Sequence, residues 1–365
     1  MIYILVDPGY ANSIWCRKRL NDLSNQLKLR RYAYRVVDSI ESISAHAFHV
    51  FLIGMDRGWI EGMIRSFNAR NIYPIWLCNL SQYQVRGDYS IVCMDMVRSM
   101  SKLVKALKRN GRQNLGLYGI NPYSTADQGK YQSFLAATEG NNDQWFFYND
   151  GDLAKCFSDF QARGKQVDTM ICCNNYAAIS LVRHLKQWDP QRLEHMMIVG
   201  DADVALAGLY SANITLVRNC SDEFGKAAVA LLDTLRKMPK GTVASVNLQW
   251  DVDALEIRSH CRGVPEERLP ASTLASQDRF YTDEEVQQMM RIEQLLSFGS
   301  KVDKTILKGL RRGLNYTQIA EDSFISVNTV KYHVKKMMDQ VRVGNRRQFA
   351  DLIDAFLPEE SVDDI

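Results

Sequence analysis

The sequence has little that would place the protein in a membrane or in an oxidising compartment. It contains no run of 18 apolar residues, so we expect no membrane span. The first residues, up to Asp7 and Pro8, lack a basic stretch and a long apolar core, and we expect a first strand there and no signal peptide. The eight cysteines are scattered, as in proteins of the reducing cytoplasm, and we expect a cytoplasmic protein.

Motifs for metal binding and catalysis are also missing. No CxxC pair and no Cys/His metal spacing occurs, which argues against structural zinc and against a disulfide framework. The sequence contains no GxSxG elbow, no Walker loop, no GxGxxG fingerprint and no HExxH motif. We therefore expect no metal, no cofactor and no catalytic residue. An enzyme whose site the sequence does not reveal remains an alternative.

Basic and acidic residues nearly balance over most of the chain, but one segment has an excess of basic residues. The net charge is only +3, yet residues 301–350 contain 11 Lys or Arg against 4 Asp or Glu. The other 315 residues contain 34 basic and 38 acidic side chains. A local positive field of this kind favours a polyanion, usually nucleic acid. A solvated helical face is the alternative on charge alone.

Residues 1–260 alternate between short apolar runs and longer amphipathic stretches. Strands that alternate with helices favour parallel sheets with helices on both faces. Nine strands are more than one doubly wound domain needs, so we expect two α/β lobes with a break near residues 109–113. The expected strands are Ile2–Val6, Val50–Ile53, Ile75–Leu77, Ser90–Val92, Leu115–Tyr118, Gln144–Phe147, Thr169–Cys173, Met196–Val199 and Thr215–Val217.

The stretch 262–281 is the predicted linker, because it contains Pro265, Pro270 and several serines without a clear period. A helix is expected to begin at Thr282, since Thr282 and Glu285 have the spacing of a capping box. The apolar stripe of that helix suits either packing inside the chain or a dimer contact. The stripe comprises Val286, Met289, Met290, Ile292 and Leu296. The predicted domains are 1–261, 262–299 and 300–358.

Four short helices are expected near the C-terminal end, and the middle two have the pattern of a helix-turn-helix. Ile319 and Ala320 can pack against Val330 and Val334, which would fix the angle between these two helices. The second of the pair then directs polar and cationic side chains outward, where they can reach bases and phosphates in the major groove. These side chains are Asn328, Thr329, Lys331, Tyr332, Lys335 and Lys336. The four helices are predicted at 302–312, 316–322, 327–341 and 346–356.

Two stretches resemble the helix-turn-helix of LuxR/NarL-type regulators. Residues 313–320 (GLNYTQIA) resemble the family's G-x-S/T-x-x-x-I-A stretch, and residues 325–333 (ISVNTVKYH) resemble its I-S-x-x-T-V-K-x-H stretch. The resemblance implies that 327–341 is a recognition helix and that double-stranded DNA is the partner. Asn315 replaces the usual Ser or Thr, and GSKVD at 299–303 replaces the usual L-T-x-R-E opening. The predicted DNA-binding residues are Thr317, Ser326, Asn328, Thr329, Lys331, Tyr332, Lys335 and Lys336.

Four stretches of the front part resemble the effector-binding domain of LacI/GalR regulators, which has the periplasmic-binding-protein fold. They are ILVDP at 4–8 with Trp15, residues 125–134, MICCNN at 170–175 and IVGDAD at 198–203. The resemblance implies a small-molecule effector, such as a sugar, at the carboxyl ends of strands between two lobes. Lys130 replaces the usual Arg and Ala202 the usual first Asp, which argues against a typical sugar. The predicted ligand-binding residues are Tyr10, Trp15, Lys130, Asn174 and Asp203.

LacI regulators carry their helix-turn-helix at the N-terminus, whereas here it lies at the C-terminal end, so the chain resembles a hybrid of the two families. We expect a two-lobed α/β sensor of the periplasmic-binding-protein type, followed by an all-α helix-turn-helix domain. The expected function is a homodimeric, ligand-controlled transcription regulator that binds double-stranded DNA. The alternative sensor is a phosphorylated receiver domain, with Asp7 and Asp56 near two of its acidic positions. A receiver leaves residues 115–260 unexplained.

Overall fold

The computed structural model describes residues 1–9, 11, 13–47, 49–54, 56–78, 85–138, 145–201, 204–218, 223–252 and 280–365. The chain divides into two units, Met1–Met100 with Asn219–Asp251 and Ser101–Arg218 with Val252–Ile365. Nearly all of the predicted linker at 262–281 lies outside the described residues. Within the described ranges, every helix is too short or too polar to span a bilayer.

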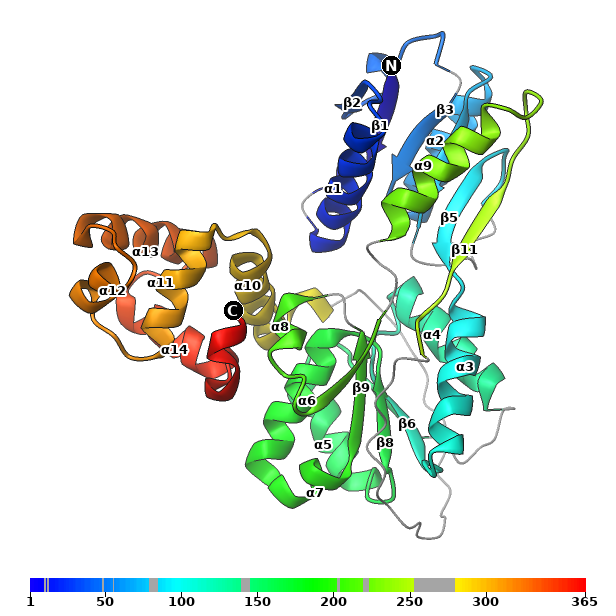
Figure 1. The fold of residues 1–365 in the computed structure, drawn as a ribbon. Helices are drawn as coiled ribbons and strands as arrows, with labels where there is room; N and C mark the ends of the chain where they lie inside the picture. Colours follow the sequence, from blue (N-terminus) through cyan, green and yellow to red (C-terminus); the bar gives the residue numbers. More distant parts are fainter. Residues whose placement is uncertain are drawn as a thin grey trace. The chain divides into compact units, whose positions relative to one another are not determined.

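The first unit is built on a six-stranded parallel sheet with the order β11-β5-β4-β3-β1-β2 (Figure 1). Its inner strands are nearly continuous apolar runs, as expected where helices cover both faces of a parallel sheet. Gly225 allows α9 to approach α1, because a Cβ at this position would lie 2.5 Å from the backbone oxygen of Asp22. The strands are β1 (Ile2–Val6), β2 (Tyr34–Val37), β3 (His49–Ile53), β4 (Tyr73–Leu77), β5 (Ser90–Met94) and β11 (Ser245–Leu248). The helices are α1 (Ile14–Leu29), α2 (Arg57–Asn68), α9 (Phe224–Leu235) and the 3-10 turn η1 (Ile40–Ser42).

The second unit contains a five-stranded parallel sheet with the order β10-β9-β8-β6-β7. Gly119, near the end of β6, has a φ of 72° and lies against Ala177 in α6, where a side chain would not fit. Helix α3 (Met96–Arg109) begins in the first unit and ends in the second. The strands are β6 (Leu115–Ile120), β7 (Trp145–Tyr148), β8 (Thr169–Cys172), β9 (Met197–Asp201) and β10 (Ile214–Val217). The helices are α4 (Thr125–Ala137), α5 (Leu153–Arg163), α6 (Asn175–Trp188), α7 (Pro190–His195) and α8 (Ala205–Gly208).

The sequence prediction of parallel sheets with flanking helices is confirmed, and all nine expected strands are present within a residue or two at most ends. Two strands are missing from the prediction, namely β2 and β11. Both are edge strands of the first sheet, and each has two exposed residues among its four. An edge strand has no neighbour on one side and keeps polar side chains, so its sequence lacks the apolar run that marks inner strands.

The C-terminal residues 280–365 of the second unit are all helical apart from the connecting turns. They comprise η3 (Phe280–Thr282), α10 (Glu284–Phe298), α11 (Lys301–Arg311), α12 (Tyr316–Asp322), α13 (Val327–Val341), α14 (Arg346–Phe356) and η4 (Glu359–Asp364). Helices α12, α13 and α14 have the predicted bounds, and α11 begins and ends one residue earlier than predicted. The prediction that a helix begins at Thr282 is wrong in detail, because Asp283 is the N-cap of α10. The Asp283 carboxylate also accepts the Leu153 N–H of α5 (2.7 Å), a tertiary contact that the local sequence does not reveal.

The apolar stripe of α10 packs inside the chain. Val286, Met289, Ile292 and Leu296 are fully buried in a core that also contains side chains of α6, α8, α13 and α14, and Met290 packs on it. The stripe is therefore covered within a single chain and is not available as a dimer contact. This common core joins the C-terminal helices to the second lobe.

Candidate nucleic-acid interface and effector site

Helix α13 has one buried face and one exposed face. Ser326 is its N-cap, and the Ser326 Oγ accepts the backbone N–H of Thr329 (3.0 Å). The buried face consists of Val330, Val334, Met337 and Val341. The opposite face is exposed and carries polar and cationic side chains at helical spacing. Its first part carries Asn328, Lys331, Tyr332 and Lys335, and the exposed residues further along the helix are Asp339 and Gln340. The sequence predicted the first four of these residues as DNA contacts, and α13 presents them on one face.

Helix α12 supports α13 from one side. Asn315 and Gln318 form a capping box at its start, so Asn315 does the work of the Ser or Thr that it replaces. Ile319 and Ala320 are buried in the same core as Val330 and Val334 of α13, as predicted. Thr317 lies exposed in the first turn of α12, next to this cap. The turn between the two helices contains Phe324, which has a φ of 54° and is 96% exposed.

A buried carboxylate anchors α13 on α11. Asp303 forms a capping box with Ser300 at the start of α11, and its side chain is only 2% exposed. His333 Nδ1 lies 2.7 Å from Asp303 Oδ1, and Lys336 Nζ donates to Asp303 Oδ2 at 3.0 Å. Burial by itself would raise the pKa of Asp303, but hydrogen bonds from His333, Ser300 and Lys336 lower this pKa well below its ordinary value. Asp303 is therefore ionised at neutral pH and fixes the rotation of the exposed face of α13.

This geometry separates the predicted DNA-binding residues into two groups. Lys331 and Lys335 are exposed, whereas Lys336 is half-buried and paired with Asp303. Thr329 is also half-buried, and its hydroxyl lies 2.8 Å from the Ser326 hydroxyl. Ser326 and Thr329 thus cap the start of α13, and Lys336 holds α13 on α11 through Asp303.

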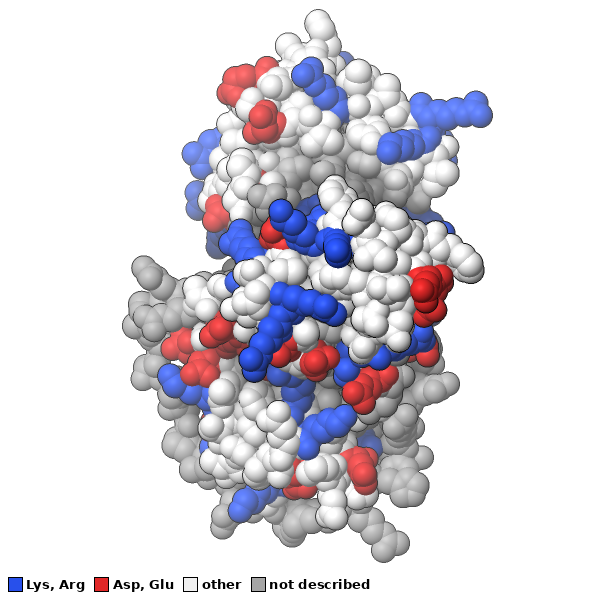
Figure 2. Space-filling view, turned by 90° about the vertical axis from the view of Figure 1, so that its left-hand side faces the viewer, with Lys and Arg blue, Asp and Glu red and all other residues white. Residues whose placement is uncertain are grey.

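Basic side chains are spread over the surface of helices α11 to α14. The exposed ones in this segment are Lys301, Arg312, Lys331, Lys335, Arg342, Arg346 and Arg347. Figure 2 views the molecule from the side on which these helices lie in Figure 1, and Lys and Arg side chains are exposed on that face, interspersed with Asp and Glu. The positive charge that the sequence concentrates at 301–350 is therefore a surface property.

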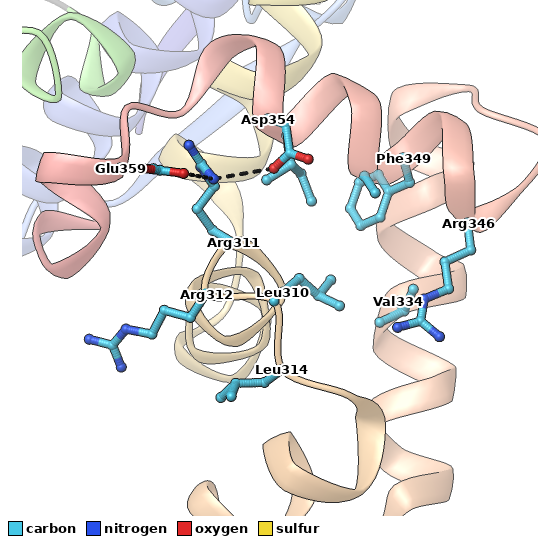
Figure 3. Close-up of a pocket in the computed structure, with 12 residues that line it drawn as sticks. Leu310, Arg311, Arg312, Leu314, Val334, Arg346, Phe349, Asp354 and Glu359 are labelled. Atoms are coloured by element: carbon cyan, nitrogen blue, oxygen red, sulfur yellow. Dashed lines mark hydrogen bonds and ion pairs between the residues drawn. The ribbon is translucent and has the colours of Figure 1, made fainter.

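A pocket of about 470 Å³ lies between α11, α13 and α14. Figure 3 shows Val334 and Phe349 on one side of this pocket, Leu310 and Leu314 on the other, and arginines around it. Arg311 donates to Asp354 (3.3 Å) and Glu359 (3.4 Å), while the guanidinium of Arg346 lies 4.3 Å from the centre of the Tyr316 ring. Because these cations are engaged within the domain, the exposed face of α13 is the better candidate for phosphate and base contacts.

A second group of polar residues lies at the carboxyl edge of the second sheet. Asn121 follows β6, Asn149 follows β7, Asn174 and Asn175 follow β8, and Asp201 ends β9. The carboxyl edge is where ligands bind in open parallel α/β sheets. Within the described part of the chain, Asn149 Nδ2 and Asn175 Oδ1 are buried atoms without a hydrogen-bond partner. This edge is the candidate effector site of the second unit.

Lys130 of α4 projects to the same edge and is deeply buried there. Its Nζ donates to Asp201 Oδ2 at 2.9 Å and to the backbone oxygen of Cys173 at 2.6 Å. Burial would lower the pKa of Lys130, but the carboxylates of Asp201 and Asp127 raise it above its ordinary value. Lys130 is therefore charged, and its ion pair with Asp201 connects α4 to β9.

The other predicted ligand residues have different surroundings. Asn174 caps α6 through a hydrogen bond from the Ala177 N–H (2.9 Å) and is half-buried at the carboxyl edge. Trp15 lies in α1 of the first unit, half-buried, with the Arg19 guanidinium 5.9 Å from its ring centre. Tyr10 and Asp203 lie outside the described residues.

Sequence reasoning missed several polar residues of this edge, namely Asn121, Asp127, Asn149, Asn175 and Asp201. The signal that could have found most of them is simple, since Asn121, Asn149 and Asp201 each stand at or directly after the last residue of an apolar strand. Within the described residues, no group of three or more His, Cys, Asp or Glu side chains could hold a metal ion.

Comparison with known proteins identifies the C-terminal helices. Residues 300–353 match the family "Bacterial regulatory proteins, luxR family". This range begins at the N-cap of α11 and includes all of α12 and α13. None of the curated proteins compared with the chain shows a significant sequence match.

Solved structures resemble the rest of the chain. A transcription regulator from Lactobacillus plantarum is 13% identical with a TM-score of 0.53, covering 68% of this chain and 97% of that one. An ABC transporter solute binding protein from Bacillus halodurans, with bound myo-inositol, is 12% identical with a TM-score of 0.53 and covers 68% and 93%. A LacI family transcriptional regulator from Weissella paramesenteroides, with bound sucrose, is 18% identical with a TM-score of 0.52 and covers 71% and 98%.

These similarities decide between the sensor alternatives. At such identities they show the fold alone, and that fold has two α/β sheets, as the chain has. The receiver alternative is wrong, because the second sheet occupies residues that a receiver leaves unexplained, and Asp56 serves as the N-cap of α2. Residues 300–353 thus match the luxR family of bacterial regulatory proteins, which makes the chain a transcription regulator with a luxR-type DNA-binding domain, and the α/β part before it has the fold of LacI regulators and periplasmic binding proteins.

Proposed function

We propose that the protein acts in the cytoplasm as a homodimer, that α13 enters the major groove of duplex DNA, and that a small polar effector bound by the sensor changes the affinity for DNA. It acts as a regulator and not as an enzyme. The observation that carries the proposal is the exposed face of α13, on which Asn328, Lys331, Tyr332 and Lys335 stand beside each other while Asp303 fixes the helix from behind.

The proposed contacts divide by chemistry. Lys335 and Thr317 suit phosphate oxygens, which hold the domain on the duplex without reading its sequence. Asn328, Lys331 and Tyr332 lie in the first half of α13, the part of a recognition helix that reaches base edges. A homodimer would place two such helices on two half-sites of one duplex.

The first expected result is salt-sensitive DNA binding by the full chain. Because Lys and Arg side chains displace counterions from phosphates, the logarithm of the binding constant should fall linearly with the logarithm of the salt concentration. Fluorescence anisotropy with labelled genomic fragments measures this slope, and sedimentation with and without DNA measures the dimer. A chain that shows no salt-sensitive affinity for any duplex would remove the proposed function.

The effector is proposed to be a polyol or sugar-like molecule that hydrogen-bonds at the carboxyl edge of the second sheet. Two observations support this class. Solved structures of the same fold hold myo-inositol and sucrose. The edge offers the amides of Asn149, Asn174 and Asn175, and the buried cation Lys130 is already neutralised by Asp201. Neutral amide groups suit hydroxyls better than a charged ligand.

A panel of sugars and polyols is expected to contain at least one compound that raises the melting temperature of the full chain. At a concentration of 100 times its Kd, the compound adds about 2.7 kcal/mol to the free energy of unfolding. The Asn174→Ala variant should lose this rise. The matched control is Asp189→Ala, which also removes the N-cap of a helix, α7, away from this edge. Asp189→Ala should keep the full rise in melting temperature. If Asn174→Ala keeps it as well, Asn174 does not contact the effector.

A further inference from the structure

Helix α8 is attached at its start to the helix that carries the DNA-binding domain. Glu293 of α10 accepts the backbone N–H groups of Ala205 (3.0 Å) and Leu206 (2.8 Å), one with each carboxylate oxygen. Glu293 is fully buried, and the Ser297 hydroxyl also donates to it. A buried carboxylate costs several kcal/mol unless hydrogen bonds compensate it, so this contact is specific and is not a chance approach of two helices.

The other end of the same segment is attached to a different helix of the DNA-binding domain. Tyr210 lies two residues after α8, and its hydroxyl donates to the backbone oxygen of Phe356, the last residue of α14 (3.1 Å). Tyr210 is only 7% exposed. Residues 204–210, called here the α8 segment, therefore hold α10 through Glu293 and α14 through Tyr210.

The α8 segment is also close in the chain to the candidate effector site. Asp201, the partner of Lys130, ends β9 only four residues before Ala205. On the far side, Met289 and Ile292 of α10 share one buried core with Val334 and Met337 of α13. A packed core of this kind moves as a unit, because its side chains have few alternative arrangements.

We propose that the α8 segment is the element through which the second lobe of the sensor sets the position of the recognition helix. Glu293 and Tyr210 are its positioning residues. The inference rests on the proposed function and adds the route of regulation. An effector that alters the Lys130–Asp201 pair would displace α8, and with it α10 and α14, so that α13 presents its exposed face differently. Binding linkage is reciprocal, so DNA on α13 must also change the α8 segment.

This reciprocity allows a test without a known effector. Hydrogen exchange of the full chain is measured with and without a saturating mixed-sequence duplex at low salt. In the wild type, the duplex should change the exchange rates of the Ala205 and Leu206 amides by about fivefold or more. Tyr210→Phe removes one hydroxyl and keeps the ring, and Glu293→Gln removes one charge. Each should still bind the duplex and protect α13 but show a smaller change at Ala205 and Leu206.

The matched controls are Tyr148→Phe, a tyrosine at the exposed end of β7, and Glu284→Gln, an exposed glutamate on α10, and both should respond as the wild type does. Melting temperatures of all variants separate a loss of stability from a loss of response. The proposal is overturned if the duplex protects α13 in the wild type without changing Ala205 and Leu206, or if Tyr210→Phe responds fully. Failure of the proposed function looks different, since the duplex would then protect nothing in α13.

Discussion

The Lys331→Ala variant is expected to bind a duplex selected by the wild-type chain about 5- to 150-fold more weakly, which corresponds to a loss of about 1–3 kcal/mol. Lys331 is exposed on α13, and within the described residues no carboxylate forms an ion pair with it, so its charge is free to meet DNA. Anisotropy titrations against the selected duplex and a scrambled duplex measure the loss. The loss should be larger on the selected duplex, because a base contact carries sequence preference.

Two other lysines complete this experiment. Lys335→Ala should weaken binding to both duplexes alike and reduce the salt slope by about one, as expected for a phosphate contact. Lys155→Ala, on an exposed position of α5 far along the chain from the DNA-binding domain, should change neither affinity. An unaltered affinity of Lys331→Ala for the selected duplex would remove Lys331 from the contacts and leave Asn328 and Tyr332 as candidates for base recognition.

The DNA-binding helices could be predicted from the sequence because their boundaries are encoded locally. Asn315, Ser326 and Asn345 each stand directly before α12, α13 and α14, and each side chain accepts the N–H of the third residue of its helix. The local sequence does not fix the start of α10, because Thr282 and Asp283 are neighbours and both are good N-caps. Asp283 also accepts the backbone N–H of Leu153, which lies 130 residues earlier in the chain, and this contact favours Asp283 as the N-cap.

The sensor site could be predicted only in part, for a related reason. The family resemblance indicates Lys130, but its partner Asp201 lies 71 residues away, and no local pattern connects them. The polar residues at the strand ends carry a local signal, yet only the sheet order β10-β9-β8-β6-β7 brings them to one edge. The same holds for Glu293, whose position within the apolar stripe of α10 gives no hint that it accepts the N–H groups of α8.

The second large effect is expected at Asp303, where the carboxylate joins α11 to α13. Asp303→Asn should lower the local stability of α13 by about 1.5–3 kcal/mol, the range for hydrogen bonds to charged groups, because His333 and Lys336 lose their anionic partner. In hydrogen exchange of the full chain at pH 7, the amides of α13 should exchange about 10- to 150-fold faster than in the wild type. Asp322→Asn, at an exposed acid on α12, is the matched control and should leave the exchange rates unchanged.

The pH dependence of this effect follows from the direction of the pKa shift. The pKa of Asp303 is lower in the folded domain than the value of about 3.9 in an unfolded chain, so its stabilising contribution is complete above pH 3.9 and is lost as the pH falls through the folded value. The difference in α13 protection between wild type and Asp303→Asn should therefore be large at pH 7 and shrink below about pH 3.9. An equal difference at pH 3 and pH 7 would mean that Asp303 stabilises α13 by its shape and capping alone, and not by its charge.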